Sequence, residues 1–205
     1  NGEIYNFREL REELEKSGHR FSTNSDNEII IHLYEDLGPS FISKLHGMFA
    51  FALWDKKKKG LLLARDRLGI KPLYFWKGDN GTAIVSEPKQ LRAFPGFQAH
   101  ADLQLVQDFL VDGVMEHEPG RCMFKGVHPL PPAHRLQWSL GSMPDAATAQ
   151  CYWSMTSQTE PMSWEDAVAS TRHRVIESVR LRMRSDVPVG SCLSGGTDSS
   201  SIVSI

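Results

Sequence analysis

The spacing of the apolar residues changes along this 205-residue chain, and the change limits the folds that the chain can adopt. In the first part they recur at helical spacing, which predicts helices over residues 7–16 and 27–37. Asn6 is the expected N-cap of the first helix, and Ser25 or Asp26 is that of the second.

Apolar runs without helical spacing come next. Residues 48–54 and 60–65 flank a lysine-rich turn and predict a β-hairpin. Residues 73–76 and 82–85 flank Gly78-Asp79-Asn80-Gly81 and predict a second hairpin, because Asn-Gly favours the tight turn that hairpins need. Two shorter helices are expected over residues 87–94 and 102–111.

The pattern changes again at Ser163. Ser163 and Asp166 match a capping box at the start of a helix that reaches Arg184. Residues 187–193 are typical of a short buried strand, which leads into the glycine-rich loop 194–200 and then into another helix. The first part of the chain is therefore predicted to be α+β, and the last part α/β.

These changes divide the chain. We place a first domain at residues 1–150, a linker at 151–162 and a second domain at 163–205. The chain starts at Asn1 and stops at Ile205, within an expected helix. We therefore interpret it as an internal segment of a longer protein, in which the N-terminal part of the first domain and the C-terminal part of the second are missing.

Charge and cysteine content narrow the class of protein. A formal net charge of −2 gives no general attraction to nucleic acid or to an anionic membrane. No apolar run approaches the roughly 18 residues of a membrane span, and no signal peptide is recognisable. Cys122, Cys151 and Cys192 are far apart and odd in number, which is typical of a reducing compartment, so we expect the cytoplasm. The histidines in loops lack metal-ligand spacing, and we predict no zinc site.

The loop at 194–200 indicates a phosphate site. Its glycines let the backbone approach a ligand closely, and the following helix start exposes unpaired N–H groups. The loop lacks the lysine of a Walker motif. Asp198 would repel phosphate by itself, so its presence indicates a divalent cation. The alternative is a Gly-Ser turn capped by Asp198.

The first two residues suggest an oxyanion hole. A side-chain amide on Asn1 and the backbone N–H of Gly2 are two neutral donors that can converge on one oxygen. By itself, however, Asn-Gly is more often a turn.

The whole hexapeptide Asn1-Gly2-Glu3-Ile4-Tyr5-Asn6 resembles the substrate-binding strand of the class II glutamine amidotransferase domain of glutamine-hydrolysing asparagine synthetases. The resemblance implies that Asn1 and Gly2 stabilise the oxyanion formed from the glutamine amide. It also implies that Glu3 and Asp26 help to bind glutamine, together with Asn1 and Gly2. A helix cap is an equally plausible local role for Asp26, and both roles can hold at once.

Residues 187–200 are similar to the pyrophosphate loop of the N-type ATP pyrophosphatases in the same synthetases. The resemblance implies Mg²⁺ beside Asp198. The residues that match the ATP-binding motif are Leu193, Ser194, Gly195, Gly196, Asp198, Ser199 and Ser200. Residues 47–53 and 65–74 also match signatures of this family, and we interpret Arg65 and Asp66 as structural rather than catalytic.

The resemblance implies a fold and a reaction. The fold is a four-layer αββα domain of the Ntn-hydrolase type, truncated at its N-terminus, followed by the beginning of an α/β ATP-pyrophosphatase domain. The reaction is the ATP-dependent amidation of aspartate to asparagine through β-aspartyl-AMP, with ammonia from glutamine. The family's nucleophile is an N-terminal cysteine, and no cysteine stands near Asn1, so we expect this segment alone to be inactive.

The expected partners are the small molecules glutamine, aspartate and ATP. We also consider a homodimer, on which the sequence itself is silent. Three alternatives stay open: a related amidotransferase that adenylates another carboxylate, a non-catalytic module that binds glutamine or nucleotide, and, least favoured, a structural protein. The acceptor pocket would distinguish the related amidotransferase from a synthetase that acts on aspartate. The residue at the mature N-terminus would distinguish the non-catalytic module from an enzyme.

Overall fold

The computed structural model describes residues 1–79, 81–113, 120–139, 141–142, 144–157 and 161–205. They form two compact units, Asn1–Met155 and Thr156–Ile205. The expected Asn-Gly turn at Asn80 and part of the expected linker fall outside the described residues. None of the described helices combines the length and the apolar character that crossing a membrane requires.

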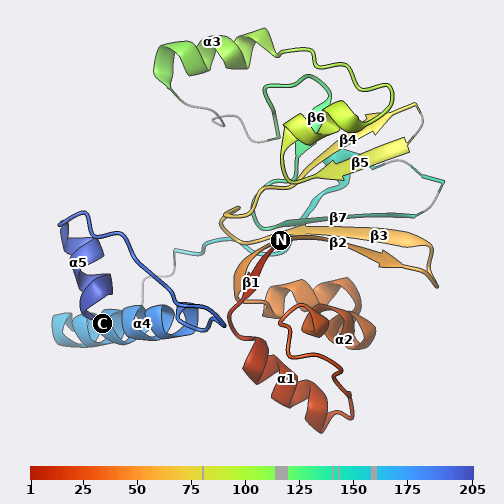
Figure 1. Ribbon diagram of the computed structural model, residues 1–205. Helices are drawn as coiled ribbons and strands as arrows, with labels where there is room; N and C mark the ends of the chain where they lie inside the picture. The colour runs from red at the N-terminus through yellow and green to blue at the C-terminus, as the bar shows by residue number, and fades with distance from the viewer. Residues whose placement is uncertain (80, 114–119, 140, 143, 158–160) are drawn as a thin grey trace. The chain divides into compact units, whose positions relative to one another are not determined.

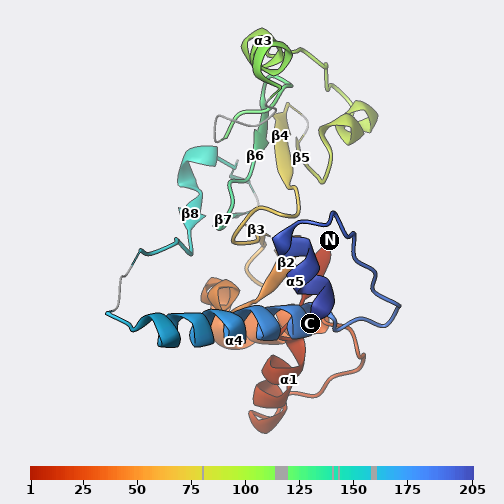
Figure 2. The ribbon, with the colours of Figure 1, turned by 90° about the vertical axis from the view of Figure 1, so that its left-hand side faces the viewer.

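The first unit contains two antiparallel sheets (Figure 1). The strands are β1 (Gly2–Ile4), β2 (Gly47–Asp55), β3 (Gly60–Arg65), β4 (Tyr74–Gly78), β5 (Gly81–Val85), β6 (Val127–Pro129), β7 (His134–Ser139) and β8 (Gln150–Cys151). The five-stranded sheet has the order β1-β2-β3-β7-β8. The three-stranded sheet has β4 between β5 and β6, as Figure 2 shows.

Helical segments cover both sheets. The α-helices of this unit are α1 (Phe7–Lys16), α2 (Glu28–Leu37) and α3 (Leu103–Asp112), and the 3₁₀ helices are η1 (Gly38–Lys44), η2 (Pro88–Ala93) and η3 (Ala146–Thr148). In Figure 1, α1 and α2 lie on one side of the five-stranded sheet, and the three-stranded sheet lies on the other.

Three apolar clusters fill the spaces between these layers. Phe49 of β2 points to a cluster with α1, α2 and η1, whereas its neighbour Ala50 points to a cluster between the two sheets with Phe75 of β4. Successive strand residues face opposite sides, so one strand supplies both cores. On the outer face of the small sheet, Tyr74 and Leu91 of η2 belong to the third cluster. The predicted four-layer arrangement is therefore confirmed.

The predicted helices and hairpins of the first unit are confirmed, and Asn6 stands at the N-cap position of α1, but neither helix has the side-chain cap that was predicted. The Asn6 side chain makes no capping bond; its Nδ2 donates to the Lys44 carbonyl at 3.0 Å and its Oδ1 accepts from the His46 N–H at 2.9 Å. Helix α2 has Asn27 at its N-cap, also without a side-chain capping bond. Asp26 instead accepts the N–H of Ile4 at 2.8 Å. The side chains expected to cap these helices instead form hydrogen bonds with residues that are distant in sequence.

Asp66 and Arg65 fix the turn after β3. The buried Asp66 carboxylate accepts four backbone N–H groups at 2.9–3.2 Å, from Phe49, Leu68, Ile70 and Lys71. The buried Arg65 guanidinium donates at 2.8–2.9 Å to three carbonyls, those of Gly69, Lys71 and Leu130. Both side chains form hydrogen bonds with backbone groups, which supports the interpretation of Arg65 and Asp66 as structural residues.

The second unit contains α4 (Trp164–Arg182) and α5 (Thr197–Ser204). The Ser163 cap of α4 is confirmed, since its hydroxyl accepts the Asp166 N–H at 3.1 Å; the Asp166 carboxylate accepts from the same hydroxyl at 2.8 Å rather than from the Ser163 backbone N–H that a full capping box uses. The predicted strand at 187–193 is wrong: these residues form no strand, and Val187 and Leu193 are 69% and 61% exposed. An extended segment is stabilised by pairing with neighbours, and no described strand pairs with this one.

We predict that Asp66→Asn lowers the free energy of unfolding by about 2–4 kcal/mol, because the new amide sets N–H donors against backbone N–H groups in a buried site. Urea unfolding of the chain measures the loss. Asp112→Asn, at an exposed position at the end of α3, is the matched control and should stay within about 0.5 kcal/mol of the parent. An equal effect of the two substitutions would contradict the structural role of Asp66.

Candidate glutamine and nucleotide sites

Strand β1 lies at the edge of the five-stranded sheet, and its register determines which groups point outward. Asn1 and Ala50 exchange two backbone hydrogen bonds, of 3.1 and 2.8 Å. Farther along, the Tyr5 N–H donates to the His46 carbonyl at 2.8 Å. Because bonded and non-bonded pairs alternate in an antiparallel ladder, the N–H groups of Gly2 and Ile4 point away from β2.

These two outward donors differ in their partners. The Ile4 N–H bonds to Asp26 Oδ2, whereas the Gly2 N–H has no bonding partner among the residues that the structure describes. The sheet edge therefore offers a free backbone donor at Gly2 and, two residues along, a carboxylate fixed to the strand. Sequence reasoning named Gly2 and Asp26, but it did not foresee that Asp26 is anchored by Ile4.

The backbone geometry requires glycine at position 2. Its φ is +135°, and a Cβ atom there would stand 2.0 Å from the carbonyl oxygen of Met48. Gly47, opposite Ile4, would likewise place a Cβ 2.1 Å from the Glu3 carbonyl oxygen. The close approach of β1 and β2 thus requires a residue without a side chain at both positions.

Asn1 and Glu3 present their side chains on the other face of β1 from Ile4. Ile4 belongs to the core beneath the helices, whereas Asn1 pairs with Ala50, which belongs to the core between the sheets. Residues one and three positions before Ile4 therefore face the side of the second sheet. Both Asn1 and Glu3 are exposed, and no hydrogen bond from the described residues holds either side chain.

The turn after β3 supports this edge. The Phe49 N–H bonds to Asp66 Oδ2 at 3.2 Å, and the Phe49 carbonyl accepts the Asp66 N–H at 2.8 Å. Phe49 pairs directly with Gly2 in the ladder. The Tyr152 hydroxyl donates to the Arg65 carbonyl at 2.7 Å, and burial raises the pKa of this phenol, so it stays protonated. Sequence reasoning missed Tyr152, because an isolated tyrosine near the end of a domain carries no local signal.

The glycine-rich loop belongs to the second unit and is described by itself. Gly195 has φ +80°, and the hydroxyls of Ser194 and Ser199 are 2.9 Å apart. Helix α5 begins at Thr197, so its first N–H groups have no partner within the helix. Asp198 is exposed in the first turn, and no described group bonds to its carboxylate. Of the remaining loop residues, Leu193 and Gly196 are exposed and Ser200 is partly exposed.

We predict that Gly2→Ala separates β1 from β2, since it introduces both a strained φ and a backbone clash. The Ala50 amide, which donates to the Asn1 carbonyl, should then exchange at least tenfold faster, equivalent to about 1.4 kcal/mol. Hydrogen exchange followed by NMR measures this. Gly18→Ala also has a positive φ, of +97°, but open space around it, and should leave the Ala50 amide unchanged. Unaltered exchange in Gly2→Ala would refute the close approach.

The chain is similar to curated proteins along nearly its whole length. Glutamine-hydrolysing asparagine synthetase 3 of Bacillus subtilis (strain 168) is 38% identical over 205 residues, covering 100% of this chain and 33% of the relative. Amidase chyE of Penicillium rubens is 38% identical, covering 98% of this chain and 29% of its own length. The chain thus spans about a third of the length of the curated relatives it matches.

A solved structure shares the fold. Glutamine phosphoribosylpyrophosphate amidotransferase from B. subtilis, complexed with ADP and GMP, superimposes with a TM-score of 0.50 at 20% identity, over 92% of this chain and 38% of that one. Two family profiles match: that of asparagine synthase over residues 170–205, and that of the glutamine amidotransferase domain over residues 1–153. Since the second match covers most of the sequence and nearly all of the first unit, the chain belongs to the glutamine amidotransferase domain family.

Proposed function

We propose that the chain is the glutamine-binding region and the start of the synthetase region of a glutamine-hydrolysing asparagine synthetase. The free Gly2 N–H on the edge of β1, beside an anchored Asp26, is the observation that carries the proposal. The similarity of the whole chain to the B. subtilis synthetase supports it. In this reaction glutamine is hydrolysed, and the ammonia attacks β-aspartyl-AMP to give asparagine and AMP, after ATP has released pyrophosphate.

The first half-reaction needs stabilisation of a tetrahedral oxyanion. As a nucleophile adds to the glutamine amide carbon, the carbonyl oxygen becomes negative and accepts stronger hydrogen bonds. The Gly2 N–H and the Asn1 side-chain amide are the donors that this chain supplies. The ladder with β2 fixes the backbone of Gly2, so its outward N–H needs no reorganisation at the moment of reaction.

The carboxylates beside this donor bind the other end of glutamine. Asp26 Oδ2 is engaged by the Ile4 N–H, and its second oxygen remains for the α-ammonium group. Gly2 and Ile4 are two strand residues apart, about 7 Å, a separation that a small extended ligand spans. Glu3 adds a second carboxylate, and its side chain lies on the face of β1 opposite to that of Ile4.

The glycine-rich loop is the proposed ATP site. Leu193, Ser194, Gly195, Gly196, Ser199 and Ser200 surround the triphosphate with backbone N–H groups and hydroxyls at the start of α5. Asp198 would contact Mg²⁺, which offsets the phosphate charge when bound. Aspartate is the proposed carboxylate acceptor.

The domain limits, location and assembly are also proposals. We propose a first domain at 1–150, a linker at 151–162 and the start of the synthetase domain at 163–205. The exposed Cys151 and Cys192 form no disulfide, which supports the cytoplasm as the compartment. A homodimer is the proposed assembly, and no nucleic acid or membrane partner is proposed.

A second candidate is an amidotransferase that acts on a carboxylate other than aspartate. The amidase of P. rubens is as similar to this chain as the synthetase is, at 38% identity. ATP–pyrophosphate exchange in the full-length protein, measured with aspartate and with other carboxylic acids in turn, distinguishes the two. Exchange that depends on aspartate supports the synthetase, and exchange that depends on another acid supports the second candidate.

In the full-length protein, Asn1→Ala should lower the kcat of glutamine hydrolysis by roughly 10²–10³-fold, the cost of one oxyanion donor. KM should change little, since the interaction strengthens mainly in the transition state. Gln98→Ala removes an exposed amide elsewhere in the same unit and serves as the control. A kcat within threefold of the parent would remove Asn1 from the oxyanion hole.

Asp198→Ala should abolish aspartate-dependent ATP–pyrophosphate exchange while sparing glutaminase activity, because only the nucleotide loop loses a group. The matched control is Asp186→Ala, an exposed aspartate of the same unit outside the loop. Exchange that survives in Asp198→Ala would exclude this carboxylate from the ATP site.

A further inference from the structure

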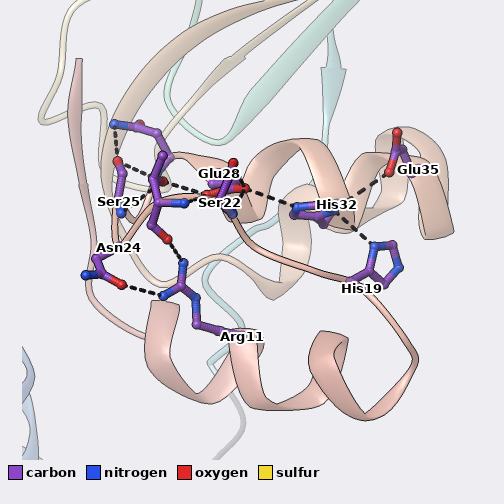
Figure 3. Close-up of polar contacts among 10 residues, drawn as sticks. Arg11, His19, Ser22, Asn24, Ser25, Glu28, His32 and Glu35 are labelled. Carbon is purple, nitrogen blue, oxygen red and sulfur yellow. Dashed lines mark hydrogen bonds and ion pairs between the residues drawn. The ribbon is translucent and has the colours of Figure 1, made fainter.

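A second group of polar side chains lies in the first unit, on the loop after α1 and on α2. Gly18, with φ +97°, follows the C-cap of α1, and the His19 N–H donates to the Leu14 carbonyl at 3.0 Å, which fixes the start of this loop. His32 and Glu35 are three residues apart on α2 and therefore share one helix face. Figure 3 shows His19, His32 and Glu35 pointing toward one another.

The inner atoms of this group are spaced like the ligands of one ion. His19 Nδ1 and His32 Nδ1 are 3.0 Å apart, and His32 Nδ1 is 3.8 Å from Glu35 Oε2. All three ligand atoms lie within 4.8 Å of one another. A tetrahedral zinc ion with bonds of about 2.0–2.1 Å separates its ligand atoms by about 3.3 Å, close to these distances.

The outer ring nitrogens face carboxylates. His19 Nε2 is 3.0 Å from Asp36 Oδ1, and His32 Nε2 is 3.6 Å from Glu28 Oε1. Glu28 is fixed in this position, because its carboxylate accepts hydrogen bonds from the backbone N–H groups and the hydroxyls of Ser22 and Thr23. Carboxylates in this position keep the proton of an imidazole on Nε2 and leave the lone pair on Nδ1.

This arrangement directs two lone pairs toward one point. With Nε2 protonated on both rings, the two Nδ1 atoms repel each other at 3.0 Å unless a cation lies between them. Two histidines, a carboxylate and a further carboxylate behind each histidine make up the donor set that binds zinc in proteins. We propose that His19, His32 and Glu35 bind one Zn²⁺ ion, with Asp36 and Glu28 orienting the two imidazoles.

The fourth ligand is water, since Glu35 opens the site to solvent. The Glu35 side chain is 62% exposed, whereas His19 and His32 are each 16% exposed. Glu35 can therefore move toward the ion without disturbing the core, and the ion has a path from solution. Bound zinc would join the loop after α1 to α2 and so stabilise the first unit. His19 and His32 are thirteen residues apart in sequence, so their spacing did not indicate a metal site in the sequence analysis.

The test is titration of the chelator-treated 205-residue chain with Zn²⁺ by calorimetry, and with Co²⁺ by visible absorption. One equivalent of zinc should bind and raise Tm, and Co²⁺ should give the bands of a tetrahedral ion without a thiolate charge-transfer band. His32→Gln should weaken zinc binding at least 100-fold and Glu35→Gln at least tenfold. Glu35 is exposed, so its substitution leaves folding intact.

His100→Gln, at an exposed loop position, is the control and should bind zinc like the parent. No saturable binding would mean that a proton alone occupies the space between the rings, and would overturn the proposal. So would zinc binding that is unchanged in both Glu35→Gln and His32→Gln. A thiolate band with Co²⁺ would assign the metal to cysteine and overturn it as well.

Discussion

The buried carboxylate of Asp66 holds together the parts of the first unit on which the rest of the structure depends. It accepts four backbone N–H groups, one from β2 and three from the turn after β3, while Arg65 closes the same turn through carbonyls. A buried charge is tolerated only when its hydrogen-bonding capacity is filled, so the backbone around it has little freedom to shift. The β2 backbone at Phe49 is fixed as a result.

The proposed glutamine site is built on that fixed strand. Phe49 pairs with Gly2, and the register of this ladder points the Gly2 N–H out from the sheet edge, while two glycines allow β1 to approach β2 closely. Asp26 is anchored at the same edge by the Ile4 N–H. A donor and a carboxylate are thus held by backbone geometry rather than by flexible side chains, which suits a site that must stabilise a developing charge.

Local signals predicted most of the elements, since hairpins and amphipathic helices depend on residues that are close in sequence. Local signals failed where the structure of a residue depends on an interaction with a segment that is distant in sequence. The side chains of Asn6 and Asp26 bind other segments instead of making capping hydrogen bonds, and residues 187–193 form no strand because no described neighbour pairs with them. The roles of Asn1, Gly2 and Asp26 came from a family resemblance, whereas the pairing of His19 with His32 requires the fold.

The most direct test of the proposed oxyanion hole follows the Gly2 amide by NMR in full-length protein labelled with ¹⁵N-glycine. The protein is treated with the aldehyde analogue of glutamine, which gives a tetrahedral adduct with a cysteine nucleophile. The account predicts a downfield shift of the Gly2 N–H and slower exchange with solvent, as expected of a new, strong hydrogen bond. A Gly2 resonance that is unchanged when the adduct forms would contradict it.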